Sequence, residues 1–376
     1  MILAGWLLLV FLADTESTPE TWVQRLGSDD FATRELAESE LSRLGLPALS
    51  SIEFGLNHAD PEIRRRCRNL VQGLREADHQ NKLGKFQKGM GTLPGWDRFC
   101  TLLPKERQET RKFYADIWAS DPGFIEEVEL NPDRAATTIF AKVQSLQLNS
   151  PRIIRANSPM VNPYTVNDVA AVMFAAQHPK ARVQSDRLQL VTSLLYGQNI
   201  QGALSGKNGA AVHEGLRTLV TSWMRSQVDI QAQMQSLYLC QNLELKEGVL
   251  LARDLLKSGR LQPHGRGVAC SLIGRLGTRE NIPDIAPLLS DSSHMNNFQV
   301  RPREMGTVQV RDVALAILVH LTGQSHKDYG FGFATAGQAF QVGSTYNMGF
   351  LAEDKRLEAL KKWDAYAQEN KLPGRP

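Results

Sequence analysis

The chain has 376 residues, enough for two globular domains or one extended array of repeats. Hydrophobic residues make up 42% of the sequence and charged residues 22%, which argues against a wholly disordered chain. The 43 basic and 40 acidic residues leave a formal net charge of +3. This balance argues against a dedicated nucleic-acid binder, which concentrates positive charge to neutralise phosphates.

The chain begins with an apolar run at residues 2–13, preceded by no Lys or Arg and followed at once by the polar residues 14–18. A helix of this length extends only about 18 Å, short of a hydrocarbon core of roughly 30 Å, so a full span is not expected. The run has the length of a secretory signal, although Phe11 occupies a position near Ala13 where a small residue is usual. We predict that residues 1–13 are a signal peptide or an N-terminal apolar anchor. The protein is then exported, to the periplasm or outside the cell, and any membrane contact is through this segment; the alternative is a buried N-terminal helix.

Helical periodicity is the clearest signal in the rest of the chain. Asp60 is a helix-capping residue type, and Pro61 stands at the first position of a predicted helix. The layout recurs about thirty residues upstream, where an apolar stripe ends at Gly45 and a second helix opens at Pro47. The pattern predicts helical hairpins over residues 19–77. The stripe that follows Asp60 consists of Ile63, Cys67, Leu70, Val71 and Leu74.

Similar helix pairs are predicted near the C-terminus. One apolar stripe begins at Ala269 and stops at Gly277, and the next begins at Ile282. Matching stripes occur about 33 residues earlier and about 45 residues later. The extra length falls in residues 292–307, which we predict to be a loop between two helices. Helix pairs repeated at this period indicate an α-solenoid over residues 207–323.

Some of these segments resemble a known family. Residues 310–314, which read Val-Arg-Asp-Val-Ala, resemble the second helix of a HEAT or lyase-type HEAT repeat, and so do residues 63–74. Residues 276–285 resemble the link between successive repeats. The resemblance covers about residues 19–74 and 228–323. It implies a curved stack of helix pairs with a concave binding face, of the kind found in exported bacterial HEAT-like proteins.

Between the two arrays the chain is predicted to be helical, without an evident repeat. Residues 78–95, rich in Lys, Gln and Gly, are the predicted linker. Residues 96–206 form an irregular helical region, in which Thr165 and Asp168 have the spacing of a capping box. No alternating stretch is long enough to predict a strand.

Residues 324–350 combine glycines with aromatic residues and are predicted to form a long loop. Loops of this length within compact domains are often functional, and aromatic residues are enriched where interfaces bury most. The alternative is that the loop folds back over the end of the solenoid, together with a capping helix predicted at residues 351–370. The candidate interaction surface consists of Tyr329, Phe331, Phe333, Phe340, Tyr346 and Phe350.

Two short motifs approach known chemistry without completing it. The segment from Gly202 to Lys207 resembles a phosphate loop, but its glycine spacing is one residue short and Asn208 replaces the expected Ser or Thr. His213 begins a pattern like that of a zinc-protease helix, but Arg217 stands where the second histidine belongs. We predict no catalytic, cofactor-binding or metal-ligating residue.

Cysteines and histidines are too scattered to indicate a site. Cys67, Cys240 and Cys270 fall on apolar helical faces and are interpreted as small buried hydrophobes. His320 and His326 are close in sequence, but solvated or helix-terminal histidines are the simpler interpretation.

A minor basic patch is predicted near the N-terminal repeats. Arg64 and Arg68 share a helical face, and Arg75 follows two turns further on. Such a face binds phosphate in some repeat proteins. Acidic residues flank the patch, however, so a solvated face is the preferred interpretation.

The sequence therefore predicts an all-α, HEAT-like α-solenoid of stacked helical hairpins. As a function we predict an exported scaffold or adaptor that binds a protein partner and needs no cofactor. One alternative is an enzyme on a helical-repeat scaffold, with its site in residues 96–206. The other is a repeat protein that binds nucleic acid or phosphate, which the charge balance disfavours.

Overall fold

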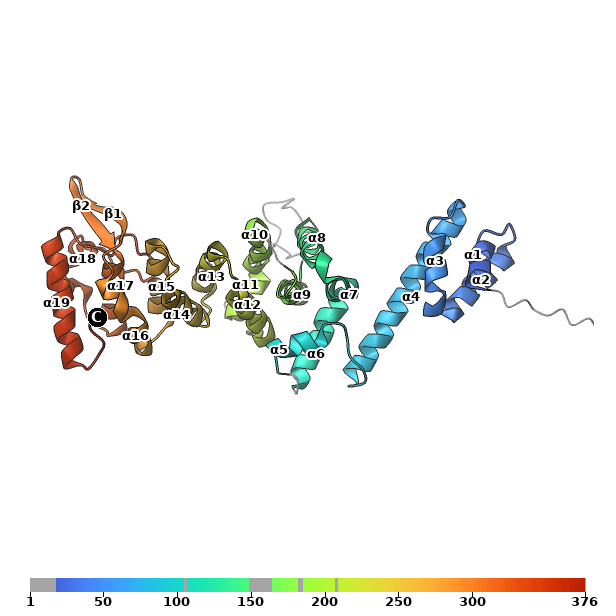
Figure 1. Cartoon of the computed structure of the whole chain (residues 1–376), viewed down its shortest axis with the longest axis horizontal. Helices are drawn as coiled ribbons and strands as arrows, with labels where there is room; N and C mark the ends of the chain where they lie inside the picture. Colours follow the sequence, from blue (N-terminus) through green and yellow to red (C-terminus); the bar gives the residue numbers. More distant parts are fainter. Residues whose placement is uncertain (1–17, 105–106, 149–163, 182–184, 207–208, 376) are drawn as a thin grey trace, which may run out of the picture. The chain divides into compact units, whose positions relative to one another are not determined.

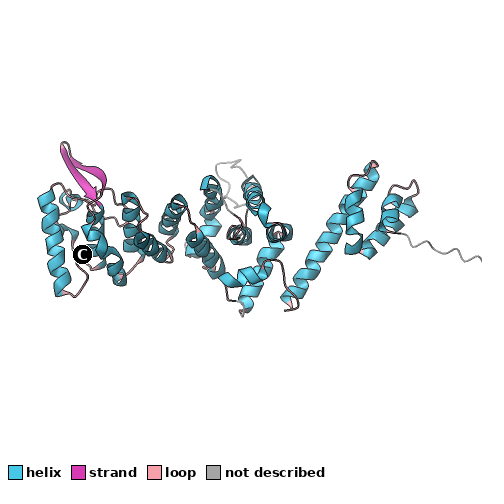
Figure 2. Ribbon diagram, in the orientation of Figure 1, coloured by secondary structure: helices cyan, strands magenta, loops and turns pink. Residues whose placement is uncertain are grey.

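The computed structural model describes residues 18–104, 107–148, 164–181, 185–206 and 209–375. Within these ranges the chain forms nineteen α-helices, short 3-10 turns and one two-stranded antiparallel sheet (Figures 1 and 2). The all-α prediction is confirmed. The chain divides into two compact units, residues 1–93 and residues 94–376. The predicted signal peptide or anchor at residues 1–13 lies outside the described residues.

None of the helices in the described ranges has both the length and the apolar character required to cross a bilayer.

Four helices form the first unit: α1 (Pro19–Arg25), α2 (Phe31–Leu44), α3 (Leu49–Gly55) and α4 (Pro61–Gln87). Their apolar stripes meet in one core, which includes Leu41, Ile52 and Cys67, each with no exposed surface. The stripe predicted from Ile63 to Leu70 faces this core. Burial raises the pKa of the Cys67 thiol to about 11, as expected for a thiol that packs as a hydrophobe.

Helices α2 and α4 begin in the same way, thirty positions apart. Asp30 and Asp60 each cap their helix by accepting a hydrogen bond from a backbone amide of the first turn, both at 2.8 Å. Four residues after each cap, the guanidinium of Arg34 or Arg64 turns back and donates to the carbonyls of the two residues before the cap, at 2.6–3.1 Å. The sequence repeat is therefore also a repeat of hydrogen bonds.

The predicted linker at residues 78–95 differs from the structure in its first half. Helix α4 continues without interruption to Gln87, and the boundary between the two units falls after Leu93. The added turns contain the ion pair of Lys82 with Asp78, at 2.7 Å and helical spacing, and they bury Phe86. The predicted linker therefore contains the last turns of α4 as well as the boundary between the two units.

The second unit opens with the region predicted to be helical and irregular. Seven helices occupy it: α5 (Trp96–Leu102), α6 (Gln108–Ser120), α7 (Pro122–Leu130), α8 (Ala135–Leu148), α9 (Val166–Ala175), α10 (Ser185–Ser193) and α11 (Gln198–Ser205). Helix α9 lies at the centre, with residues 169–175 all fully buried. Thr165 and Asp168 form the predicted capping box at its start.

The following helices pack in alternation. They are α12 (Glu214–Ser226), α13 (Ile230–Leu243), α14 (Gly248–Ser258), α15 (Pro263–Leu276), α16 (Ile282–Ile285) and α17 (Val310–Leu321). Helix α15 packs against α13 on one side and α17 on the other, and α14 packs against α15. Arg266 repeats the contact of the first unit, because its Nη1 donates to the carbonyl of Leu261 just before its helix at 2.9 Å. Cys240 and Cys270 are buried among these helices, as predicted.

Residues 292–307 were predicted to be a loop, but most of them form a β-hairpin. Strand β1 (His294–Arg301) pairs antiparallel with β2 (Glu304–Gln309), and the hairpin extends away from the neighbouring helices (Figure 1). Arg303, with φ of 72°, makes the turn. Phe298 is 3% exposed and packs over Gly306, so one side of the hairpin is anchored while its other residues are mostly polar. Because most residues of the hairpin are polar, the sequence lacks the alternation of apolar and polar residues that would predict a strand.

The chain ends in a cap over α17. Phe350 forms a two-hydrogen-bond backbone bridge with Thr307 of β2, at 3.0 and 3.2 Å. The helix predicted at residues 351–370 is α19 (Glu353–Glu369), which buries Trp363 against α17 and the 3-10 turn His326–Tyr329. A short helix, α18 (Gly332–Thr335), lies within the predicted loop.

Candidate functional site

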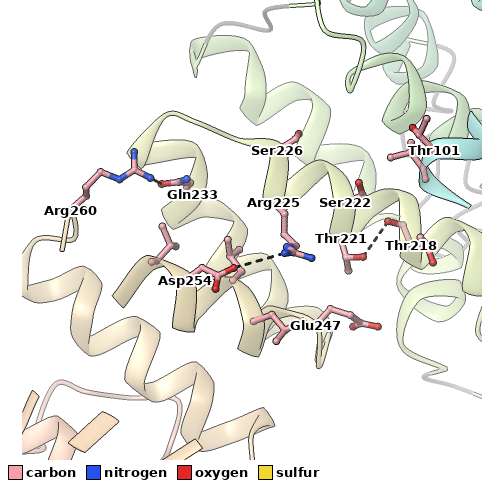
Figure 3. Close-up of a pocket in the computed structure, with 14 residues that line it drawn as sticks. Thr101, Thr218, Thr221, Ser222, Arg225, Ser226, Gln233, Glu247, Asp254 and Arg260 are labelled. Carbon is pink, nitrogen blue, oxygen red and sulfur yellow. Dashed lines mark hydrogen bonds and ion pairs between the residues drawn. The ribbon is translucent and has the colours of Figure 1, made fainter. Parts of the chain in front are cut away.

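A groove of about 600 Å³ lies between α12 and α14, next to the end of α5 (Figure 3). Its residues come from four helices of the second unit, α5, α12, α13 and α14, and from Arg260 after α14. The walls of the groove are therefore rigid helices. Positively and negatively charged side chains, hydroxyl groups and leucines all line it.

Helix α12 forms the first wall because its two faces differ sharply. One face is apolar and buried in the unit, through Leu216, Leu219, Val220, Trp223 and Met224. The opposite face carries Thr218, Ser222 and Ser226, which recur every fourth residue and line the groove (Figure 3). Such small side chains keep the groove open and present hydroxyl groups that both donate and accept hydrogen bonds.

Helix α14 forms the second wall. Leu251 and Leu255 point into the unit and are 5% and 3% exposed, whereas Leu250 is 40% exposed at the groove. Glu247 and Asp254 place carboxylates on the same face (Figure 3). The wall therefore offers an apolar contact between two acidic groups.

The carboxylates of Glu247, at the N-cap of α14, and of Asp254, within α14, are in different states. Glu247 is paired with Arg217 of α12, with N···O distances of 2.7 and 2.9 Å. Asp254 has Arg225 at 3.9 Å and Arg253 at 3.8 Å, which is beyond direct hydrogen bonding. Glu247 therefore joins the two walls, while Asp254 is held loosely.

Arg260 borders the same groove after the end of α14. Its Nη2 donates to Oε1 of Gln233 at 3.3 Å, so its charge faces a neutral amide (Figure 3). Gln233 is 7% exposed and is fixed in turn, because its Nε2 donates to the carbonyl of Gln227 at 2.7 Å. Gln233 stands four residues after the cap of α13, Asp229, and thus makes the turn-back contact described for Arg34 and Arg64.

A second cavity of about 580 Å³ lies at the N-terminal end of α12 and shares Thr218 with the groove. His213 caps α12 by accepting the amide of Leu216 at its Nδ1, at 3.2 Å. Its ring packs on Phe113 of α6, with centroids 4.5 Å apart. The exposed face of α12 thus borders cavities at both ends.

Comparison with known proteins gives no guide to this groove. No family model matches the chain, and searches of curated proteins and of solved structures found no match. The interpretation of the groove therefore depends on its own geometry.

The predicted aromatic interaction surface is mostly buried, and this prediction is corrected. Tyr329, Phe331, Phe333 and Phe350 are at most 3% exposed. They pack together, with the Phe331 and Phe350 rings 4.7 Å apart and the Phe331 and Phe333 rings 5.3 Å apart. The glycines between them permit this packing, since a side chain at Gly349 would collide with Thr307. The loop folds back on the unit, which was the stated alternative.

Of the remaining two aromatic residues of that surface, Phe340 joins the cluster, with its ring 5.8 Å from that of Phe333, and Tyr346 does not. Phe340 stacks on the imidazole of His326 at 3.8 Å between centroids, whereas Tyr346 is 64% exposed. His326 also donates from Nε2 to the carbonyl of Ala316 at 2.8 Å, and burial lowers its pKa. His326 is thus part of the packed cap and opens the 3-10 turn His326–Tyr329, which fits the helix-terminal half of the prediction and not the solvated half.

The basic patch of Arg64, Arg68 and Arg75 is engaged in local contacts. Arg64 bonds backbone carbonyls, as described above, and Arg75 donates to Glu53 of α3 at 2.7 Å. Arg68 is exposed. The neighbouring Arg66, which the patch omitted, is 8% exposed and is surrounded by carboxylates of Glu35, Glu38 and Glu62. Arg66 and Arg75 thus link α4 to neighbouring helices through carboxylates, which neutralise part of the positive charge here.

The two incomplete motifs have structural roles where they are described. Gly206, with φ of 71°, ends α11 in the left-handed conformation, and Lys207 lies outside the described residues. His213 and Arg217 serve as helix cap and ion-pair partner. Across the described ranges, no group of three His, Cys, Asp or Glu side chains has a metal-binding arrangement.

The apolar stripes of the sequence give no sign of the groove, because they mark only the buried faces of the helices. A signal was present in the hydroxyl residues at positions 218, 222 and 226, opposite the buried face of α12. The partner residues on α14 and Arg260 have no such spacing relation to α12 and are brought there only by packing.

Proposed function

We propose that this chain is a helical-repeat scaffold that binds an extended segment of another protein in the groove between α12 and α14. The observation that carries the proposal is the composition of that groove. Hydroxyl groups of Ser222 and Ser226 can bond a peptide backbone, and Leu250 can contact an apolar side chain. The walls are helices, so little ordering is needed on binding.

The repeat architecture supports a scaffold role. The alternating packing of α13, α15 and α17 is what a HEAT-like solenoid requires. The turn-back contact four residues after the cap recurs at Arg34, Arg64, Gln233 and Arg266, in both predicted arrays. We take this recurrence as support for one repeat type across the chain, with surfaces between helices left open for a partner.

The groove favours binding over catalysis. Glu247 is engaged by Arg217, and Asp254 is 52% exposed, so neither is a desolvated group held ready for proton transfer. The same carboxylates disfavour a nucleic-acid backbone, whose phosphates they would repel.

The proposal is tested by selecting peptides from a random display library on the purified chain. Ser222→Trp fills the groove, and Lys361→Trp on the exposed side of α19 is the matched control. Circular dichroism and urea unfolding establish that both variants fold. We expect enriched peptides to bind the wild type and Lys361→Trp but not Ser222→Trp. The absence of enriched peptides, or equal binding to Ser222→Trp, would overturn the proposal.

Export remains part of the proposal and rests on residues 2–13. N-terminal sequencing of the mature protein from fractionated cells tests it. A mature chain that begins after Ala13 in the envelope or medium is expected, and an intact chain in the cytoplasm would contradict export.

A further inference from the structure

Positive charge is in excess at the end of the groove where α12 and α14 finish. Glu247 is already neutralised by Arg217. That leaves one carboxylate, Asp254, facing the guanidinium groups of Arg225 and Arg253. Arg253 does not line the groove, but Arg260 does, and its bond is to an uncharged amide. The groove is therefore lined by two guanidinium groups, of Arg225 and Arg260, and by one carboxylate, of Asp254, that has no partner at direct hydrogen-bond distance within the described residues.

The arginines are accessible to a ligand. The side chain of Arg225 is 56% exposed and reaches across the groove towards Asp254, and Arg260 is exposed at the same border (Figure 3). Neither guanidinium makes a charged hydrogen bond at direct contact distance within the described residues. A charge-assisted hydrogen bond to a ligand would be stronger than the contacts they now make.

From this charge distribution we infer that the bound segment is acidic and that Arg225 and Arg260 recognise a carboxylate on it. The inference rests on the proposed function and specifies its partner. The hydroxyl group of Ser222 lines the same wall as Arg225 and can donate to the same carboxylate, whereas that of Ser226 donates to the carbonyl of Trp223. Asp254 acts as an internal competitor, because it attracts Arg225 when the groove is empty.

A carboxylate has two sources in a protein partner, an Asp or Glu side chain and a free chain end. Both present the same planar oxygen pair that a guanidinium binds. A polyanion such as nucleic acid fits less well, since Asp254 and Glu247 border the groove over which its phosphates would extend.

The test uses an acidic peptide obtained from the display selection, with binding measured by fluorescence anisotropy. Matched peptides replace each Glu or Asp by Gln or Asn, or amidate the free C-terminus. We expect the decisive neutral replacement to weaken binding about fivefold or more. The position of that replacement identifies the source of the carboxylate.

The protein variants should change the affinity for the acidic peptide in opposite directions. Arg225→Gln and Arg260→Gln each weaken binding of the acidic peptide about fivefold and leave the neutral peptide unchanged. Asp254→Asn strengthens binding of the acidic peptide severalfold, because Arg225 loses its competitor. A merely structural role for these residues predicts no such gain.

The outcomes separate the inference from the proposed function. If no peptide binds in the groove, the proposed function fails and the inference fails with it. If peptides bind but neutral and acidic forms bind equally, or Asp254→Asn brings no gain, only the inference is overturned. Preferential binding of an oligonucleotide, with the same dependence on Arg225 and Arg260, would also overturn it.

Discussion

Arg356 of α19 holds Asp312 at the start of α17 through two hydrogen bonds, from Nε to Oδ1 at 2.7 Å and from Nη2 to Oδ2 at 3.1 Å. The two residues are 2% and 0% exposed. Nη2 also donates to the carbonyl of Thr307 in β2 at 3.0 Å, and Nη1 pairs with Glu353. One guanidinium thus joins the last helix, α17 and the hairpin. Burial raises the pKa of Asp312 to about 6, against the opposing attraction of Arg356.

Replacing Arg356 is expected to destabilise the second unit strongly. Arg356→Met leaves Asp312 buried without its cation, and the free energy of unfolding should fall by about 3–5 kcal/mol. Urea unfolding followed by tryptophan fluorescence measures the loss. Lys355→Met, one position earlier and 62% exposed in its side chain, is the control and should change little.

The loss caused by Arg356→Met should depend on pH. The pKa of Asp312 in the folded chain, about 6, exceeds its ordinary 3.8, so the stability that its proton contributes is present at low pH and is lost as pH rises through about 6. In the Arg356→Met variant at about pH 5, the side chain of Asp312 is a neutral acid. At about pH 7.5 it is either a buried carboxylate or must take up a proton. The loss should therefore be larger at pH 7.5. An equal loss at both values would contradict this account.

Two residues of the folded-back aromatic loop should differ in how much their replacement destabilises the chain. Phe331 is fully buried, and Phe331→Ala should lower the free energy of unfolding by about 3–5 kcal/mol. Tyr346 is 64% exposed, and Tyr346→Ala should stay within about 0.5 kcal/mol of wild type. Thermal and urea unfolding measure both. Similar losses for the two variants would show that the cap packs differently.

Gly248 permits the close approach of α14 and α13. A Cβ at this position would lie 2.8 Å from the sulfur of Cys240 and closer still to its Cβ. Gly248→Ala should therefore cost about 1–3 kcal/mol through overpacking. Gly73→Ala in α4 is the contrasting variant, because nothing lies within 4 Å of its added Cβ. That variant should be neutral or gain up to about 1 kcal/mol from higher helix propensity.

We predict that His326 makes the stability of the second unit sensitive to mild acid. Burial lowers its pKa in the folded chain below the ordinary 6.5, so the stability it contributes is present above that value and is lost as pH falls. The contribution of His326 to the unfolding free energy should therefore decrease as the pH falls below about 6.5, opposite in sign to the contribution of Asp312. His326→Gln should reduce that slope, because the titrating group is gone. Urea titrations at each pH provide the measurement, and an unchanged slope would assign the effect to other groups.

The helices were predictable where burial leaves a period in the sequence. Asp60 with the stripe from Ile63 to Leu74 specifies α4, and Thr165 with Asp168 specifies the start of α9. In each case the residues that cap the helix and those that face the core are close together in the chain. Such local information is available to inspection of the sequence alone.

The hairpin and the groove depend on contacts between distant residues. Phe298 is anchored by Gly306 and by Gly349 from the far side of the loop, while its sequence neighbours are amides. Asp254 and Arg225 belong to different helices, and nothing local specifies that they meet. The aromatic loop shows the opposite discrepancy. The composition of the loop predicts an exposed Phe331, whereas tertiary packing buries this residue.

The backbone bridge between Thr307 and Phe350 has a consequence for biosynthesis. A ribosome delivers β2 and α17 well before the segment that covers them, so the partly made chain presents the apolar end of α17 to its surroundings. Closure must wait for Arg356 and Trp363 to emerge near the C-terminus. Premature termination before Trp363 should therefore give a nascent product that chaperones retain and proteases degrade.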